Sequence, residues 1–303
     1  MAALLRARGL TKRYGDVVAL DGAEFEIEDT VTGLLGPNGA GKSTAIKLFL
    51  GLLAPTGGVA EVLGETAAGN PSVRARLGYM PEHDCLPQTV SAAEFLTHMA
   101  GVSGLPPAHA RARAAETLRH VGLFEERYRP IGGYSTGMKQ RVKLAQALVH
   151  DPLLVLLDEP MAGLDPTGRD EMLDLVRKTH RDFGISVVLS SHIMGDVERV
   201  CEHIVVLEAG RVAQQGQIAA FAGDTPTLYV EVTAGRDEFV AALRERSVLA
   251  AVEDGTVVIA NVDDRGYDVI RDALAASGSP LRRMAPRRRA LTELFRDGEG
   301  RGP

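Results

Sequence analysis

The chain has 303 residues, which is room for one large domain or two modest ones. It carries 34 lysines and arginines against 40 aspartates and glutamates, and this net charge of −6 disfavours a general nucleic-acid binder. Two widely separated cysteines, Cys85 and Cys201, argue against a disulfide scaffold or a structural zinc site. The longest apolar runs, such as residues 153–157, are far shorter than the roughly 20 residues that span a bilayer. Because Arg6 and Arg8 also interrupt any secretory pattern, we expect a soluble, cytosolic protein.

Strand-like and helical patterns alternate over the first 220 residues or so. The apolar strand 31–35 runs directly into a glycine-rich loop, and a helix with apolar residues at helical spacing follows at 45–52. Further strands are predicted at 17–20, 24–27, 153–157 and 186–189, and further helices at 138–149 and 168–183. This alternation predicts an α/β fold with a largely parallel sheet, and the mostly helical stretch 91–127 indicates an inserted subdomain.

The composition shifts at residues 223–226, and we predict a second, small α+β domain at 226–303. Its expected elements are a strand at 228–232, a helix at 237–245, two strands around 254–255 and a helix at 267–276. We expect an arginine-rich tail after them, because residues 281–303 hold seven arginines and three acidic residues.

The glycine-rich loop has the sequence GPNGAGKST and satisfies the pattern G-x-x-x-x-G-K-[ST]. In such a loop the glycines let backbone N–H groups surround a phosphate, and the following helix adds the positive end of its dipole. Lys42 is expected to reach the β- and γ-phosphates, and the Ser43 hydroxyl to ligate Mg²⁺. The predicted phosphate-binding residues are Gly36, Pro37, Asn38, Gly39, Ala40, Gly41, Lys42, Ser43 and Thr44.

Two acidic residues follow the buried strand 153–157. Asp158 is expected to deliver a carboxylate to Mg²⁺ beside the glycine-rich loop. Glu159 is then placed to orient or deprotonate a water molecule. An apolar strand ending in Asp-Glu is common by itself, but together with the loop in this order it indicates nucleotide hydrolysis.

A third motif, residues 134–140 with the sequence YSTGMKQ, lies between these two features. Ser135, Thr136 and Gly137 at a helix N-terminus offer hydroxyls and bare backbone N–H groups, a second anion site, although an ordinary helix cap would look similar. With all three motifs in this order, the chain resembles the nucleotide-binding subunit of an ABC transporter, and residues 134–140 resemble its signature loop. Thr136 departs from the commonest form, which has a glycine there.

Other positions are similar to the same family. Residues 162–165 resemble the loop at the dimer interface, and His192, after Ser190 and Ser191, resembles the switch histidine that contacts the γ-phosphate. Tyr14 resembles the aromatic residue that stacks on adenine, although ordinary strand packing explains it equally well.

Glu82 marks a departure from the family pattern, because the family usually presents a glutamine at this place. A carboxylate here can still approach the Mg²⁺ shell, so we name Glu82 a candidate metal ligand with Ser43 and Asp158. A solvated loop acid is an equally good explanation of Glu82.

The resemblance covers about residues 1–222 and implies a P-loop NTPase of ABC type. Its expected parts are an antiparallel β subdomain, a parallel-sheet core and a helical subdomain at about 84–136. The resemblance also implies an ATPase that uses ATP and Mg²⁺ in a head-to-tail dimer, here a homodimer. Glu159, His192 and Lys42 would be its catalytic residues.

The expected partners are transmembrane permease subunits on separate chains, which would hold this chain at the cytoplasmic face of the cell membrane. The appended domain resembles type-2 exporters of the drug-resistance kind, which move drugs, lipids or polysaccharide-like cargo. We expect the arginine-rich tail either to stabilise the dimer or to contact the membrane. A solvated, charged chain end is an equally good explanation. The candidate contact residues are Arg282, Arg283, Arg287, Arg288 and Arg289.

Two alternatives belong to other functional classes. One is a soluble ABC ATPase that remodels a ribosome or a nucleic-acid complex, although no nucleic-acid partner is expected from the charge. The other is a nucleotide-binding regulator without turnover, against which Glu159 and His192 argue.

Overall fold

The structure is a computed structural model that describes residues 3–221, 224–253, 255–260, 262 and 264–288. The chain divides into two compact units, Met1–Ile218 and Ala219–Pro303. The boundary expected from composition, at residues 222–226, lies slightly further along the chain. Among the described residues, every helix is too short or too polar to cross a membrane.

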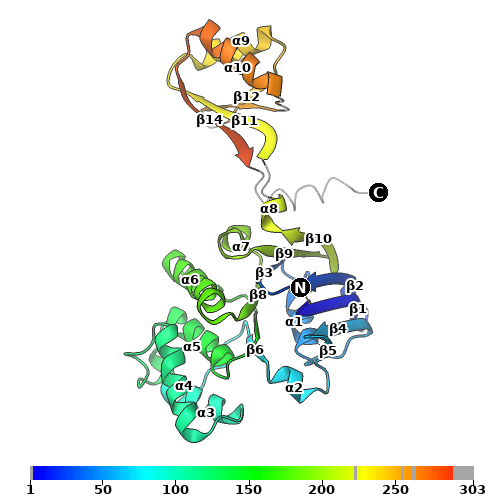
Figure 1. Ribbon diagram of the computed structural model, residues 1–303, viewed down its shortest axis with the longest axis vertical. Coiled ribbons are helices and arrows are strands. Elements are labelled where there is room, and N and C mark those ends of the chain that lie inside the picture. Colours follow the sequence, from blue (N-terminus) through cyan, green and yellow to red (C-terminus); the bar gives the residue numbers. More distant parts are fainter. Residues whose placement is uncertain (1–2, 222–223, 254, 261, 263, 289–303) are drawn as a thin grey trace. The chain divides into compact units, whose positions relative to one another are not determined.

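The first unit contains two sheets (Figure 1). An antiparallel sheet has the strand order β2-β1-β4-β5. Its strands are β1 (Leu5–Tyr14), β2 (Val17–Ile27), β4 (Gly57–Val62) and β5 (Glu65–Thr66). The second sheet has the order β10-β9-β3-β8-β7-β6 and is parallel except for β10. Its strands are β3 (Val31–Leu35), β6 (Leu77–Met80), β7 (Leu154–Leu157), β8 (Ser186–Ser191), β9 (His203–Glu208) and β10 (Arg211–Gln217).

The inner strands of the parallel sheet are apolar along their whole length. All residues of β3, β7 and β8 are buried, as expected for strands covered on both faces. A single hydrophobic core joins this sheet to the antiparallel one through Ile46 and Phe49 of α1. The two sheets therefore share one hydrophobic core.

Helices connect the strands of the first unit, and a last short helix, α8, leads from it into the second. They are α1 (Lys42–Phe49), α2 (Pro71–Arg74), α3 (Ala92–Val102), α4 (Pro107–His120), the 3₁₀ turn η1 (Ile131–Gly133), α5 (Thr136–Leu148), α6 (Pro166–Phe183), α7 (Met194–Val200) and α8 (Ile218–Phe221). Several begin at clear caps: Ser91 and Glu94 form a capping box on α3, and Asp165 accepts a hydrogen bond from the Gly168 N–H at the start of α6. Helices α3, α4 and α5 lie at one end of this unit and the antiparallel sheet at the other (Figure 1).

The second unit is a four-stranded antiparallel sheet of order β12-β13-β11-β14 with two helices. Its elements are β11 (Asp224–Val232), α9 (Arg236–Glu245), β12 (Ala250–Glu253), β13 (Thr256–Ile259), α10 (Asp264–Ser277) and β14 (Leu281–Arg288). In chain order they form a βαββαβ unit. Phe239 and Leu243 of α9 pack with Ile270 of α10 onto the buried residues of β11 and β13.

Two sequence-based expectations differ from the structure. Residues 281–288 form the edge strand β14, paired with β11, instead of the start of a tail. The sequence pattern did not indicate this strand, because charged residues are common on edge strands and obscure the alternation of apolar and polar residues. Residues 289–303 lie outside the described residues. The expected break between strands 17–20 and 24–27 is absent, because Gly22 takes a positive φ of 61° within the continuous strand β2, which pairs with β1 in a shifted register.

Candidate nucleotide-binding site

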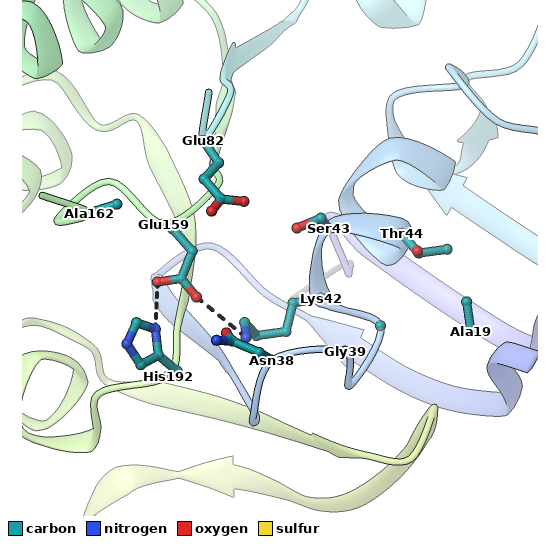
Figure 2. A pocket seen from close by; sticks show the side chains of 11 residues that line it. Ala19, Asn38, Gly39, Lys42, Ser43, Thr44, Glu82, Glu159, Ala162 and His192 are labelled. Atoms are coloured by element: carbon teal, nitrogen blue, oxygen red, sulfur yellow. Dashed lines mark hydrogen bonds and ion pairs between the residues drawn. The ribbon is translucent and has the colours of Figure 1, made fainter. Parts of the chain in front are cut away.

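Four neighbouring parallel strands end at the same edge of the central sheet. The glycine-rich loop follows β3, Glu82 follows β6, Asp158 and Glu159 follow β7, and His192 follows β8. Because the carboxyl ends of parallel strands share one edge, the topology brings these distant segments together. Figure 2 shows the cavity that they surround.

The glycine-rich loop leads into α1 with no side-chain cap from the described residues. Gly41 is the N-cap, with φ at 102°, and a Cβ on it would lie 2.4 Å from the Ala19 carbonyl oxygen. Gly39 has φ at 84°, with open space where its Cβ would stand. Only glycine combines this backbone with this close approach, so the N–H groups of the loop and of the first turn of α1 stay available to an anion.

Lys42 is the first residue of α1, and its side chain is 6% exposed. Its ammonium donates hydrogen bonds to the carbonyl oxygens of Gly36 (2.8 Å) and Pro37 (3.2 Å). It also lies 3.3 Å from Glu159 Oε1. The loop therefore holds a buried cation at its own centre, where a phosphate group would supply stronger, charged acceptors.

Ser43 and Asp158 lie in direct contact. The Ser43 hydroxyl donates a 2.9 Å hydrogen bond to Asp158 Oδ1, and Asp158 is only 2% exposed. A hydroxyl and a buried carboxylate, both oxygen donors, thus face each other across the start of α1. This is the donor chemistry that Mg²⁺ prefers.

Glu159 stands between a cation and an imidazole. Its Oε2 lies 3.0 Å from His192 Nδ1, and its Oε1 has the Lys42 ammonium 3.3 Å away (Figure 2). The backbone of Glu159 is in the left-handed region, with φ at 48°. A residue without glycine's freedom holds this conformation at a cost, and such positions cluster at functional sites.

Glu82 approaches from the side of β6, and Figure 2 shows its carboxylate facing Glu159 and Ser43. Its backbone carbonyl accepts a 2.8 Å hydrogen bond from Lys143 of α5. Burial lowers the pKa of Lys143, and the nearby Cys85, Asp84, Glu82 and Asp158 oppose that shift. Burial, with Asp158 close by, raises the pKa of Tyr79 on β6 to about 12.

The cavity has a volume of about 480 Å³. Its lining residues are Ala19, Asn38, Gly39, Gly41, Lys42, Ser43, Thr44, Glu82, Glu159, Ala162 and His192. Most of the residues predicted from the sequence are therefore brought together. Asp158 does not line the cavity but contacts it through its hydrogen bond with Ser43. Ala19 was missed, since a small apolar residue that forms a wall carries no motif, and Ala162 was expected only as part of the loop at the dimer interface.

Besides Asp158 and the three residues of the signature-like loop, four predicted residues do not line the cavity. Gly36, Pro37 and Ala40 shape the loop from outside; a Cβ on Gly36 would lie 2.3 Å from the Leu207 carbonyl oxygen, so this glycine lets the loop pack against β9. Tyr14 is 47% exposed at the end of β1, with the Lys12 ammonium 5.2 Å from its ring centre. Stacking of Tyr14 on adenine stays a prediction.

The signature-like loop lines a different cavity of about 480 Å³. Ser135 caps α5, its hydroxyl accepting a 3.3 Å hydrogen bond from the Met138 N–H. The second cavity is lined by Gly122, Leu123, Glu126, Ser135, Thr136, Gly137, Met138, Arg141, Gly163, Leu164, Asp165, Thr167, Gly168, Glu171 and Met172. The two lining sets share no residue.

The fold and the first cavity define a P-loop ATPase cassette. A family model described as ABC transporter matches residues 20–162. The uncharacterized ABC transporter ATP-binding protein YxlF of Bacillus subtilis is 39% identical over 216 residues, 71% of this chain and 71% of that protein. The daunorubicin resistance ATP-binding protein DrrA3 of Streptomyces coeruleorubidus is 33% identical over 294 residues, 95% of this chain and 93% of that protein.

A solved structure agrees with these relatives. It is a dimeric ATP-binding cassette in a post-hydrolysis state with ADP and Pi, and it superimposes with a TM-score of 0.64 at 23% identity, covering 71% of this chain and 98% of that one. This chain belongs to the ATP-binding subunits of ABC transporters, and it is an ATPase coupled to transport. The fold and the function predicted from the sequence are therefore confirmed, and the remodelling alternative is not supported.

Proposed function

We propose that this chain hydrolyses ATP in composite sites formed by two copies, and that the cycle drives export through separate membrane subunits. One observation supports the composite site above all others. The glycine-rich loop with Lys42 and the signature-like loop with Ser135 line two cavities without a common residue. If both loops contact one nucleotide, they come from different chains.

In this proposal Lys42 gives up the carbonyls of its own loop and binds the terminal phosphates of ATP, while the loop N–H groups bind the same anion. The exposed rim of the glycine-rich loop, Asn38 and Gly39, allows the anion to enter. The geometry that supports this role is the tight glycine loop, in which a Cβ on Gly41 would collide with the Ala19 carbonyl oxygen.

The residues near Lys42 fit Mg²⁺. Ser43 and Asp158 would hold the ion, and Glu82 faces the same space (Figure 2). No group of three His, Cys, Asp or Glu side chains able to hold a metal occurs in the described part of the chain. Mg²⁺ ordinarily needs only one or two carboxylates, because it keeps water and takes phosphate oxygens. When bound, it neutralises charge that develops on the phosphates.

Glu159 is proposed to orient and deprotonate the attacking water. Its Oε1 is buried and makes no hydrogen bond within the described structure, so it can accept one from water once Lys42 has turned to phosphate. His192 holds Oε2 and so fixes the direction of Oε1. The proton moves from water to Glu159 as the water oxygen bonds to the γ-phosphorus, and the bond from that phosphorus to the β–γ bridging oxygen breaks, so that ADP leaves.

We further propose that the partner chains are transmembrane permease subunits, that the assembly is a homodimer and that it lies at the cytoplasmic face of the membrane. Two findings support this proposal. The relatives are named as ATP-binding proteins of an ABC transporter and of drug resistance, and the solved cassette is dimeric. The similarity to DrrA3 extends over both units of the chain, which favours export of a drug-like or lipid-like molecule.

Complementation between two inactive variants tests the composite site. Lys42→Ala removes the phosphate cation, and Gly137→Asp adds a carboxylate to the signature-like loop, where a Cβ meets only Leu164 at 3.8 Å. Each variant alone should lack turnover. A mixture should recover about a quarter of wild-type ATPase activity, because half of randomly paired dimers would contain one intact site.

The matched control is the chain that carries both substitutions, mixed with wild-type protein. Mixed dimers of that pair contain no intact composite site, so they should add no activity to that of the wild-type dimers. A mixture of the single variants that stays as inactive as each variant alone would contradict the composite site.

A further inference from the structure

Ser190, the fifth residue of β8, makes contacts at the site that none of the three motifs assigns. Its side chain is fully buried, at 0% exposure. In the sequence it is notable only as a neighbour of His192. In the parallel pairing of β7 with β8, Leu157 stands opposite Leu189, so Ser190 stands beside the residue that follows β7.

The Ser190 hydroxyl connects the two acidic residues of the site. It accepts a 2.8 Å hydrogen bond from the Glu159 backbone N–H and donates a 2.8 Å hydrogen bond to Asp158 Oδ1. The same Oδ1 accepts the hydroxyl of Ser43. One continuous chain of hydrogen bonds therefore runs from the backbone of Glu159 through Ser190 and Asp158 to Ser43.

The backbone of Glu159 needs such a support. Its φ of 48° lies in the region that non-glycine residues avoid, and its N–H points into a buried environment. Ser190 satisfies that N–H and so favours the turn that directs the Glu159 carboxylate toward Lys42 and His192. Its own proton goes to Asp158 Oδ1, and this bond holds the hydroxyl in the orientation that accepts from Glu159.

Other buried serines of β8 lack this arrangement. Ser191 exchanges hydrogen bonds with the backbone of Ile193 in its own loop. Ser186, at the opposite end of the strand, donates to Asp29. Both are as buried as Ser190, so burial and residue type alone do not create the link.

We propose that Ser190 is a positioning residue for ATP hydrolysis: its hydroxyl, anchored on Asp158 Oδ1, fixes the backbone of Glu159 and with it the direction of the Glu159 carboxylate. The inference rests on the proposed role of Glu159, through which Ser190 acts. Ser190 itself touches neither ATP nor water in this scheme. Its loss therefore affects turnover and leaves ATP affinity in place.

Steady-state ATPase kinetics of the full chain test the inference with Ser190→Ala, Ser190→Thr and, as the matched control on the same strand, Ser186→Ala. We expect Ser190→Ala to lower kcat about tenfold, since one buried hydrogen-bonded group is lost, and to change KM for ATP less than about twofold. Ser190→Thr keeps the hydroxyl and should recover most of kcat. Ser186→Ala should stay near wild type, and thermal unfolding confirms that each variant is folded.

A double-mutant cycle separates positioning from general damage. In the Glu159→Gln background, single-turnover hydrolysis should show less than about a twofold effect of Ser190→Ala, because the group that Ser190 positions is already impaired. An equal loss in both backgrounds would overturn the inference, as would a wild-type kcat for Ser190→Ala beside an inactive Glu159→Gln variant. A fully active Glu159→Gln variant would instead overturn the role of Glu159 and, with it, the inference.

Discussion

Glu159 combines three features that fit it for the role of base proposed above. Its side chain is 12% exposed, it is held by His192 on one oxygen, and its other oxygen faces the Lys42 ammonium. If the Lys42 ammonium turns to phosphate when ATP binds, as proposed, the Glu159 carboxylate becomes free to accept a proton. The left-handed backbone conformation of Glu159 orients its carboxylate toward both His192 and Lys42.

At this scale we predict that Glu159→Gln stops turnover and accumulates an ATP-bound dimer. The amide cannot accept a proton from water, and general-base catalysis contributes about 10²- to 10⁴-fold, so kcat should fall at least a hundredfold. Light scattering coupled to size exclusion at saturating Mg-ATP should show the dimer.

Glu116→Gln is the control for this prediction. Glu116 lies on α4, is exposed and pairs with Arg113, so the same change of charge there should leave turnover near wild type. A Glu159→Gln protein that remains monomeric, both alone and in the assembled complex, would be incompatible with ATP binding between two subunits.

Helix α5 shows how one element connects the two cavities. Its N-terminus carries Ser135, its Gln140 side chain donates a 2.9 Å hydrogen bond to the Ala162 carbonyl, and its Lys143 holds the Glu82 carbonyl. Ala162 and Glu82 both line the first cavity, whereas Ser135 lines the second. A movement of α5 would therefore reach both cavities at once.

The end of α5 also supports a prediction on pH. His150, just after the helix, makes a 2.9 Å hydrogen bond with the Leu77 carbonyl of β6, and burial lowers its pKa. In the unfolded chain a histidine titrates near pH 6.5. As pH falls through that value, the unfolded state takes up a proton that the folded state resists, so stability present above pH 6.5 is lost.

We therefore expect the midpoint temperature of thermal unfolding to decrease as the pH is lowered from 7.5 to 5.5. We expect this decrease to be smaller in His150→Gln. Glutamine can still donate to Leu77 but does not titrate. His120 and His203 contribute in the same direction, since burial lowers their pKa as well. Replacement of the exposed His98 is the control, and an unchanged pH dependence in His150→Gln would refute the assignment.

At the scale of the whole molecule, both cavities lie in the first of the two units. Every residue that lines either cavity belongs to the unit Met1–Ile218, so nucleotide chemistry is confined to it. The βαββαβ unit has its own core around Phe239 and Ile270. A core of its own is what is expected of a separate domain.

We predict that the tagged full-length chain, purified from detergent-solubilised membranes, retains a polypeptide with membrane-spanning helices in stoichiometric amount. The physical reason is that the transport cycle needs a lasting attachment between the ATPase and the path of the cargo. Mass spectrometry of the purified complex identifies that partner, and the tag alone is the control. Co-purification with ribosomes in place of a membrane polypeptide would contradict the proposal.

Much of the site followed from the sequence because its chemistry is local. The glycine cradle, Lys42 and Ser43 occupy adjacent positions, and Asp158 and Glu159 end one apolar strand. The wall residue Ala19 could not be predicted, and neither could the place of Ala162 in this cavity, since both roles come only from the space that these residues border. The strand β14 was also missed, because its arginines resemble a solvated tail until the pairing with β11 is known.

By itself, the sequence determined the family, the nucleotide chemistry and the order of the motifs, because each motif is a short run whose spacing carries its function. Only the tertiary structure decided how Glu159 is held. Ser43 and Asp158 are 115 positions apart in the chain, and Asp158 and Ser190 are 32 apart. Parallel strands bring such residues to one edge, and the register of that sheet, not any local pattern, determines which hydroxyl meets which carboxylate.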